Sequence, residues 1–139
     1  MTAPEAEWTR AESGVEVRTV AESAGSPVEE TLTVATHRDP TGLTTVKVDG
    51  ELDMLTAPTL MSVVGDELDR GCTRLLVDLR PVTFLGSSGL TALIALARRC
   101  TDDQVRLRLV ADGPNVLRPL EITGLTAAFN TVSDPLEAW

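Results

Sequence analysis

The sequence has few aromatic side chains: two tryptophans, two phenylalanines and no tyrosine in 139 residues. A hydrophobic core must therefore be built from leucine, valine, isoleucine and alanine. The hydrophobic fraction is 42%, which is enough for such a core. The length fits one domain of ordinary size.

The groups that catalytic and metal sites need are also scarce. There is one histidine, His37, beside a predicted turn. The two cysteines, Cys72 and Cys100, lack close metal-ligand spacing, so we expect two buried thiols and no metal site. No Walker sequence and no G-x-G-x-x-G occurs, so no phosphate cradle and no cofactor is predicted.

Positive charge is in deficit. Twelve lysines and arginines face 21 aspartates and glutamates, and the formal net charge is -9. Such a field repels phosphate backbones and anionic lipid, and it favours a basic patch on another protein as partner. No apolar run approaches the ~20 residues of a membrane span, and the N-terminus lacks the basic head and apolar stretch of a secretory signal. We therefore expect a cytoplasmic protein with no membrane and no direct nucleic-acid partner.

The first 29 residues differ from the rest. They hold six glutamates and two prolines, and their apolar residues recur at no useful period. This composition predicts a disordered acidic tail over residues 1–29, followed by a folded domain over residues 30–139.

The first half of this domain reads as a hairpin, a helix and a buried strand. Apolar residues alternate from Leu32 and again from residue 44, around a Pro-Thr-Gly turn at 40–42, and this pattern predicts a hairpin. Thr56 is a fitting N-cap for a helix that Gly71 ends as a left-handed cap. The continuous apolar run at 75–79 is typical of a central parallel strand.

The second half continues this alternation. A loop over 81–87 is followed by a helix over 88–100 and a strand over 105–109. The next helix must be kinked or short because it contains Pro119. The sequence ends with a strand over 127–132 and a turn that Ser133 could cap. The inner stripe of the helix over 88–100 is expected to hold Leu90, Leu93, Ile94 and Ala97. The order predicts an α/β domain whose central mixed sheet is mostly parallel after an N-terminal hairpin, with helices packed against it.

Two serines at 87 and 88 lie between a strand and a helix. A nucleophile elbow needs glycine two residues either side of the serine, and neither Ser87 nor Ser88 has both. Either serine is instead well placed to N-cap the following helix. A capping role does not exclude a phosphorylation switch at the same serine, because a helix N-terminus tolerates a phosphate. The added charge of about -1.5 to -2 would change binding rather than folding.

Three segments together resemble the STAS domain of bacterial anti-sigma-factor antagonists, over roughly residues 31–132. They are Gly50 to Asp53 (GELD), Leu79 to Leu90 (LRPVTFLGSSGL) and Val116 to Leu125 (VLRPLEITGL). The resemblance implies a domain that is not an enzyme and that binds an anti-sigma factor with serine kinase activity, releasing a sigma factor. Phosphorylation of the first hydroxyl residue of the motif, which is Ser87, would end the complex, and a phosphatase would restore it. Ser88 is the second choice of acceptor.

The resemblance also implies a partner-binding surface around the acceptor. Its members are Glu51, Asp53, Gly86, Ser88, Gly89 and Thr91. Asp53 matches an acidic family position near the acceptor loop, and it equally suits a cap on the turn into the first helix. Gly86 is a departure, because the family has aspartate before the acceptor.

Two alternatives remain at this point. The first is an interaction module of the same fold that is not phosphorylated, which Gly86 favours. The second is a small-ligand-binding or hydrolytic α/β domain that uses the serine loop as a pocket.

Overall fold

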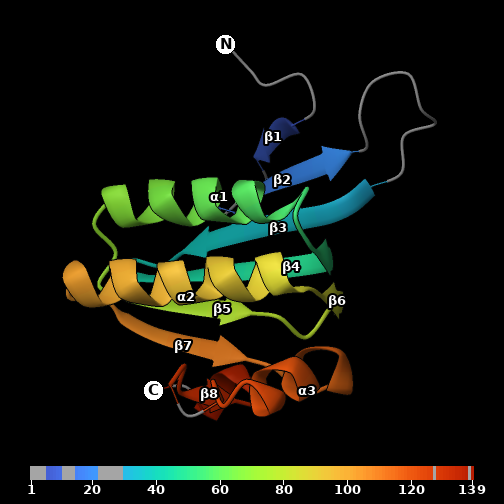
Figure 1. Ribbon diagram of the computed structural model, residues 1–139. Coiled ribbons are helices and arrows are strands. Elements are labelled where there is room, and N and C mark those ends of the chain that lie inside the picture. Colours follow the sequence, from blue (N-terminus) through green and yellow to red (C-terminus); the bar gives the residue numbers. More distant parts are fainter. Residues whose placement is uncertain (1–5, 11–14, 22–29, 127, 138) are drawn as a thin grey trace.

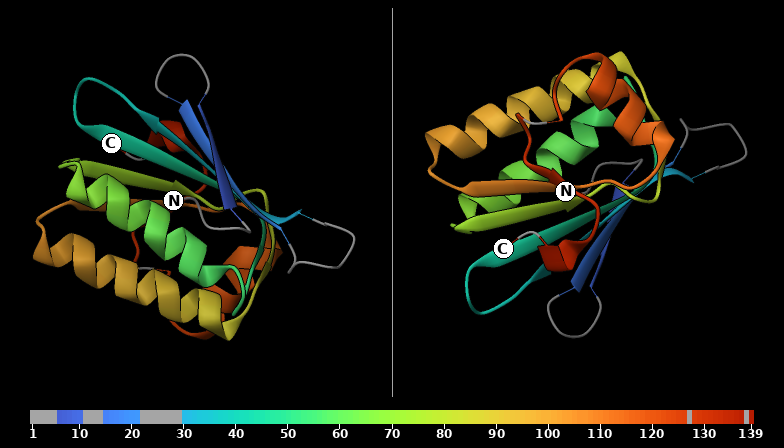
Figure 2. Two further views of the ribbon diagram at one scale, coloured as in Figure 1. Left: turned by 90° about the horizontal axis from the view of Figure 1, so that it is seen from above. Right: turned by 90° about the horizontal axis from the view of Figure 1, so that it is seen from below.

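The computed structural model describes residues 6–10, 15–21, 30–126, 128–137 and 139. One mixed sheet carries helices α1, α2 and α3 on one face (Figures 1 and 2). The strands are β1 Ala6–Arg10, β2 Val15–Ala21, β3 Glu30–Arg38, β4 Leu43–Leu52, β5 Arg74–Asp78, β6 Val82–Leu85, β7 Arg106–Val110 and β8 Thr131–Val132. The helices are α1 Ala57–Asp69, α2 Ser87–Asp102, α3 Pro114–Ile122 and the 3-10 turn η2 Pro135–Glu137.

The sheet order is β1-β2-β3-β4-β5-β7-β8, and β6 pairs with β4 off this path. Pairing is antiparallel from β1 to β4 and parallel beyond. The predicted α/β class and mixed sheet are therefore confirmed. The main core lies between the sheet and the helices, because alternate residues such as Leu75 and Val77 point to that face.

The hairpin of β3 and β4 forms as predicted. In the turn, the Asp39 carboxylate accepts the Thr41 and Leu43 N–H groups at 2.8 and 3.2 Å, and Gly42 takes a φ of +96°. Thr56 holds the N-cap position of α1 as predicted, but its side chain makes no capping bond to the helix. At the end of α1, Gly71 has a φ of +90° and its N–H donates to the Leu68 carbonyl at 3.0 Å. Such a left-handed residue closes a helix at little cost only if it is glycine.

The predicted loop over 81–87 is wrong in part, because Val82–Leu85 forms strand β6. The reason is the length of β4. Strand β5 pairs only with its first half, up to Lys47, and this leaves Gly50 to Leu52 open to pair with β6. A four-residue strand of this kind carries almost no periodic signal of its own.

The predicted inner stripe of α2 is also wrong in part. Ile94 is exposed, while Leu90 and Ala97 are half-buried and Leu93 is buried as predicted. The helix carries apolar residues on more than one face, so periodicity alone did not select the buried one. The buried positions are Gly89, Ala92, Leu93, Leu96 and Cys100.

The C-terminal elements are shorter than predicted. The final strand covers Thr131–Val132 only, and residue 127 of the predicted strand lies outside the described residues. Residues 128–130 form a turn that buries Phe129 in the core instead. In the last turn the Asp134 carboxylate accepts the Leu136 N–H at 2.9 Å. Helix α3 has nine residues and contains Pro119, so it is short as predicted.

Strands β1 and β2 lie where the sequence predicts a disordered tail. Residues 15–20 read Val-Glu-Val-Arg-Thr-Val, a period-2 pattern rich in β-branched residues, and β2 pairs with the edge of β3. The rest of the predicted tail lies outside the described residues. The boundary at residue 30 stays a prediction.

Candidate functional site

The ends of β4 and β6 bring two loops together. One is the acceptor loop, which leads from β6 into α2 and carries Ser87, and the other is the loop before α1. Leu52 and Leu85, the last residues of the two strands, are register partners. The Gly86 N–H donates to the Leu52 carbonyl at 3.0 Å. Residues 51–56 and 84–91, far apart in sequence, therefore form one end of the sheet (Figure 1).

Ser87 is the first residue of α2, and it is exposed. Gly86 occupies the N-cap position without a side-chain capping bond, so the prediction that Ser87 or Ser88 caps the helix is wrong. Among the described residues, no hydrogen bond of the Ser87 hydroxyl occurs. Its carbonyl accepts the Thr91 hydroxyl at 3.0 Å. The Ser87 hydroxyl is thus accessible at the positive end of a helix dipole.

Gly89 is buried, unlike the other residues of the predicted partner-binding surface, and its contact with a partner stays a prediction. A Cβ atom there would lie 2.7 Å from both the Leu52 carbonyl oxygen and Leu85 Cδ1. The glycine allows α2 to approach the end of β4 closely. Glu51 and Thr91 are exposed, and Asp53, Gly86 and Ser88 are partly exposed.

The structure confirms that Asp53 caps the turn into α1. Its Oδ1 accepts the N–H groups of Leu55 and Thr56 at 2.9 and 3.1 Å. The Thr56 hydroxyl completes the turn by donating to the Glu51 carbonyl at 2.7 Å. Asp53 also follows Leu52, whose carbonyl holds Gly86, so the cap lies next to the acceptor loop. Both predicted interpretations of Asp53 are compatible with this geometry.

Gly86 is not required by the backbone, since its φ of -90° and ψ of 179° suit any residue. Its neighbour in space is Phe84. A Cβ atom at position 86 would lie 3.0 Å from Phe84 Cε2. The aromatic ring therefore lies against the place where a side chain at position 86 would begin.

Large apolar side chains are exposed at the same end of the sheet as the acceptor, and the sequence did not predict them. Met54, Leu55 and Phe84 are 74%, 69% and 52% exposed. Met54 and Leu55 follow Asp53 directly, and Phe84 is the register partner of Glu51. Large exposed apolar side chains of this kind are typical of surfaces that bind another molecule. The available signal was the Met-Leu pair placed before a helix, where polar residues are usual.

An ion pair orders the chain just before β6. The Asp78 carboxylate accepts both Arg80 Nε and Nη2, at 2.9 and 2.7 Å. Burial raises the pKa of Asp78, but the hydrogen bonds from Arg80 outweigh it and hold the pKa below its usual value. The ionised pair thus braces the turn that leads into the acceptor loop.

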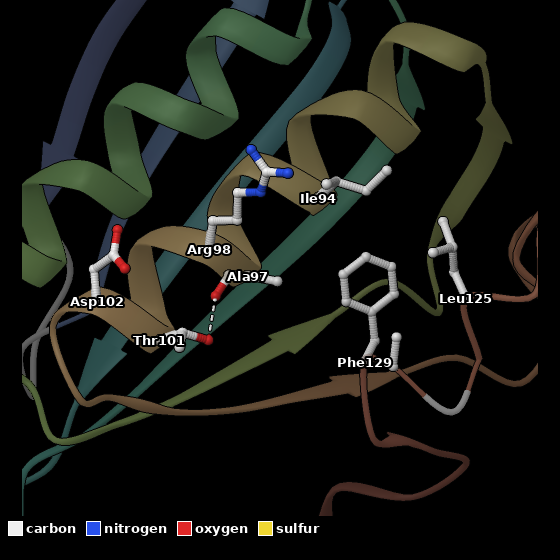
Figure 3. Close-up of a pocket in the computed structure, with 8 residues that line it drawn as sticks. Ile94, Ala97, Arg98, Thr101, Asp102, Leu125 and Phe129 are labelled. Atoms are coloured by element: carbon white, nitrogen blue, oxygen red, sulfur yellow. Dashed lines mark hydrogen bonds between the residues drawn. The ribbon is translucent and has the colours of Figure 1, made fainter.

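A cavity of about 430 Å³ lies along α2, between Ile94, Ala97 and the segment that carries Leu125 and Phe129 (Figure 3). Its lining does not include Ser87 or any other residue of the serine loop. The serine loop therefore does not contribute to this hollow, contrary to what the small-ligand alternative requires.

Within the described part of the chain, no group of three His, Cys, Asp or Glu residues is arranged to hold a metal ion. Nor is any described helix long and apolar enough to cross a bilayer.

Cys100 is buried as predicted, and burial raises the pKa of its thiol to about 12. Cys72 is only partly buried.

Comparison with known proteins points to one family. The family model described as STAS domain matches residues 33–138. The anti-sigma-F factor antagonist RsfB of Mycobacterium tuberculosis is 34% identical over 108 residues, which cover 78% of this chain and 85% of RsfB. A crystal structure of an anti-sigma factor antagonist from Mycobacterium paratuberculosis superposes with a TM-score of 0.65 at 28% identity, covering 99% of this chain and 95% of that one. The unphosphorylated form of the antagonist SpoIIAA shares the fold, with a TM-score of 0.64 at 18% identity over 76% of this chain and 91% of that one.

Proposed function

The chain belongs to the STAS domain family and to the anti-sigma factor antagonists within it, and from this premise we propose that phosphorylation of Ser87 switches its binding. The unphosphorylated protein binds an anti-sigma factor and so releases a sigma factor. The anti-sigma factor is also the serine kinase, and a separate phosphatase restores the free hydroxyl. The cycle takes place in the cytoplasm. The protein acts by binding, not by catalysis.

The observation that carries this proposal is the position of the Ser87 hydroxyl. It is exposed, at the first residue of α2, at the end of the sheet that also exposes Met54, Leu55 and Phe84. A partner that covers these side chains also covers the hydroxyl.

Phosphorylation would act on binding and leave the fold intact. The kinase transfers the γ-phosphoryl group of its own ATP to the Ser87 oxygen, the bond to ADP breaks, and the hydroxyl proton leaves to a kinase base. The free N–H groups at the start of α2 favour the added phosphate. A docked partner would have to desolvate that charge beside the carboxylates of Glu51 and Asp53. The complex therefore dissociates while the domain stays folded.

The first experiment maps the acceptor. The full chain is incubated with candidate anti-sigma factor kinases and ATP, and the phosphate is located by mass spectrometry. We expect modification of Ser87 in the wild type and in Ser88→Ala, and none in Ser87→Ala. Phosphate on Ser88 alone, or on neither serine with a partner that binds, would contradict the proposed acceptor.

The second experiment measures binding of the same partner. Ser87→Ala should bind within about twofold of the wild type, whereas Ser87→Asp should bind at least tenfold more weakly, about 1.4 kcal/mol. Ser88→Asp is the matched control for added charge one residue away.

Gly86 supports a second candidate, an interaction module that is not switched. The family aspartate before the acceptor is absent, and Phe84 lies against the place of its side chain. Equal partner binding by Ser87→Ala and Ser87→Asp would favour this static module.

A further inference from the structure

Three arginines gather around Trp139 on the face of the sheet that carries no helix. Their Cζ atoms lie 5.7 Å (Arg74), 5.3 Å (Arg106) and 5.0 Å (Arg108) from the centroid of the indole ring. Arg74 and Arg106 are register partners on β5 and β7, and Arg108 lies two residues further along β7, on the same face.

The opposite side of these strands belongs to the main core. Leu75, Leu107 and Leu109, which alternate with the arginines, pack under the helices. Turn η2, which precedes Trp139, lies across the sheet from α1 and α2 (Figure 2). We call Arg74, Arg106, Arg108 and Trp139 the arginine surface.

The positive charge of this surface is not balanced by carboxylates within the described residues. Their ion pairs include none of the three arginines. Arg74 donates to the Thr41 hydroxyl at 2.6 Å, and that hydroxyl donates to Asp39, so Arg74 is partly compensated. Among the residues that the structure describes, Arg108 donates only to the neighbouring Leu107 carbonyl, at 3.1 Å.

Like charges directly across a strand pair are destabilising, and each guanidinium has five N–H donors. Cation–π contacts with the indole offset part of that repulsion. Most of the donors remain unused. In a chain of net charge -9, this concentration of arginines outside the ion pairs of the described residues is a local feature and not a consequence of composition.

We infer that the arginine surface binds an extended acidic segment of a partner protein, with carboxylates at alternate positions. Guanidinium groups pair with carboxylates through two parallel hydrogen bonds. Arg106 and Arg108 lie roughly 6.6 Å apart along one strand, the same spacing that an extended peptide gives its alternate side chains. Trp139, 40% exposed, adds apolar area beside them. The net charge of -9 disfavours nucleic acid or an anionic membrane as the occupant.

This surface is distant from the acceptor loop. Arg74 pairs near Leu43 at the start of β4, and Leu85 pairs with Leu52 at its end. Nine residues of extended chain separate these two positions, roughly 30 Å. An acidic segment therefore binds whether or not the acceptor end is occupied, and the inference does not depend on the switch at Ser87.

The test uses the full chain and an acetylated hexapeptide of alternating glutamate and alanine, titrated by ¹H–¹⁵N NMR. Shifts should map to β7 and to the indole N–H of Trp139. The double variant Arg106→Gln/Arg108→Gln should bind at least tenfold more weakly. Arg98→Gln, which removes an exposed arginine from α2 on the other face, is the matched control and should change affinity by less than twofold. Circular dichroism checks that both variants are folded.

Further arms distinguish the occupants. A peptide of the same composition with its three glutamates in one block should bind at least threefold more weakly. Absence of binding to the wild type, equal binding of both peptides, equal loss in Arg98→Gln, or full competition by inorganic phosphate at equal concentration would overturn the inference. Self-association of the wild type that the double variant abolishes would assign the surface to a second copy and would also overturn it.

Discussion

The two ends of β4 differ in what they bury and what they expose. Near its start, the Glu67 carboxylate is buried, at 1% exposure, and Arg38 holds both of its oxygens at 2.7 and 2.8 Å. Near its end, Met54 and Phe84 are exposed although they are large and apolar. The first arrangement stabilises the fold, whereas the second leaves apolar area for a partner. The contrast predicts that substitutions at the start of β4 change stability and that substitutions at its end change binding.

Glu67→Ala should have the largest effect, and it should fall on stability alone. The loss should be about 3 kcal/mol, at the lower end of the cost of breaking a buried ion pair, because the Arg38 side chain that remains is 24% exposed. Urea unfolding of the full chain measures the loss. Asp69→Asn is the control. Asp69 lies on α1 like Glu67, but it is exposed and pairs with Arg99 of α2. Its substitution should leave the urea midpoint unchanged. Weaker partner binding by folded Glu67→Ala would contradict the division between the two ends.

Gly89→Ala should cause the next largest loss of stability, and it should distort the packing beneath the acceptor loop. The added Cβ would lie 2.7 Å from the Leu52 carbonyl oxygen, so α2 must move away from β4. Overpacking of this kind costs typically about 1–3 kcal/mol.

Gly65→Ala in α1 provides the matched control. The nearest atom to its added Cβ would be Arg99 Nη1 at 3.9 Å, an ordinary contact. A glycine in a helix interior costs roughly 0.5–1 kcal/mol relative to alanine, so this variant should be stabilised. Equal changes of melting temperature in Gly89→Ala and Gly65→Ala would show that the close approach of α2 to β4 does not require glycine at position 89.

The sequence predicted the parts of this protein that periodicity and turn chemistry specify. The hairpin, α1 and strand β5 follow from alternation and from the caps at 53–56 and 71. Strand β6 did not follow, because its pairing depends on how much of β4 the strand β5 leaves open. The burial of Gly89 likewise depends on how closely α2 approaches the end of β4, which no local pattern encodes.

Gly86→Asp restores the family residue, and it should change the stability of the fold by less than about 1 kcal/mol. The new Cβ would displace the Phe84 ring by a few tenths of an ångström, which is cheap because that ring is half exposed. A carboxylate at the N-cap position also accepts an N–H group from α2, which offsets the cost.

The same variant tests whether the kinase recognises the residue before Ser87. We expect a severalfold faster initial rate of Ser87 phosphorylation, because the carboxylate orients the neighbouring hydroxyl. Gly86→Ala displaces the ring without adding a carboxylate and should stay near the wild-type rate. Equal rates for the two variants would show that the kinase does not use the aspartate.

The smallest expected effect is the response of Cys100 to charge at Ser87. Both residues belong to α2, separated by thirteen residues or roughly 20 Å of helix. Burial raises the pKa of the Cys100 thiol to about 12, so only a minute fraction is thiolate at pH 8 and iodoacetamide should react with the half-buried Cys72 first. Because the start of α2 accommodates negative charge, Ser87→Asp should leave the labelling rate of Cys100 within about twofold of the wild type, measured by mass mapping at timed intervals. A large acceleration would mean that charge at the acceptor end loosens the far end of the helix, and the switch would then act through the fold as well as through the docking surface.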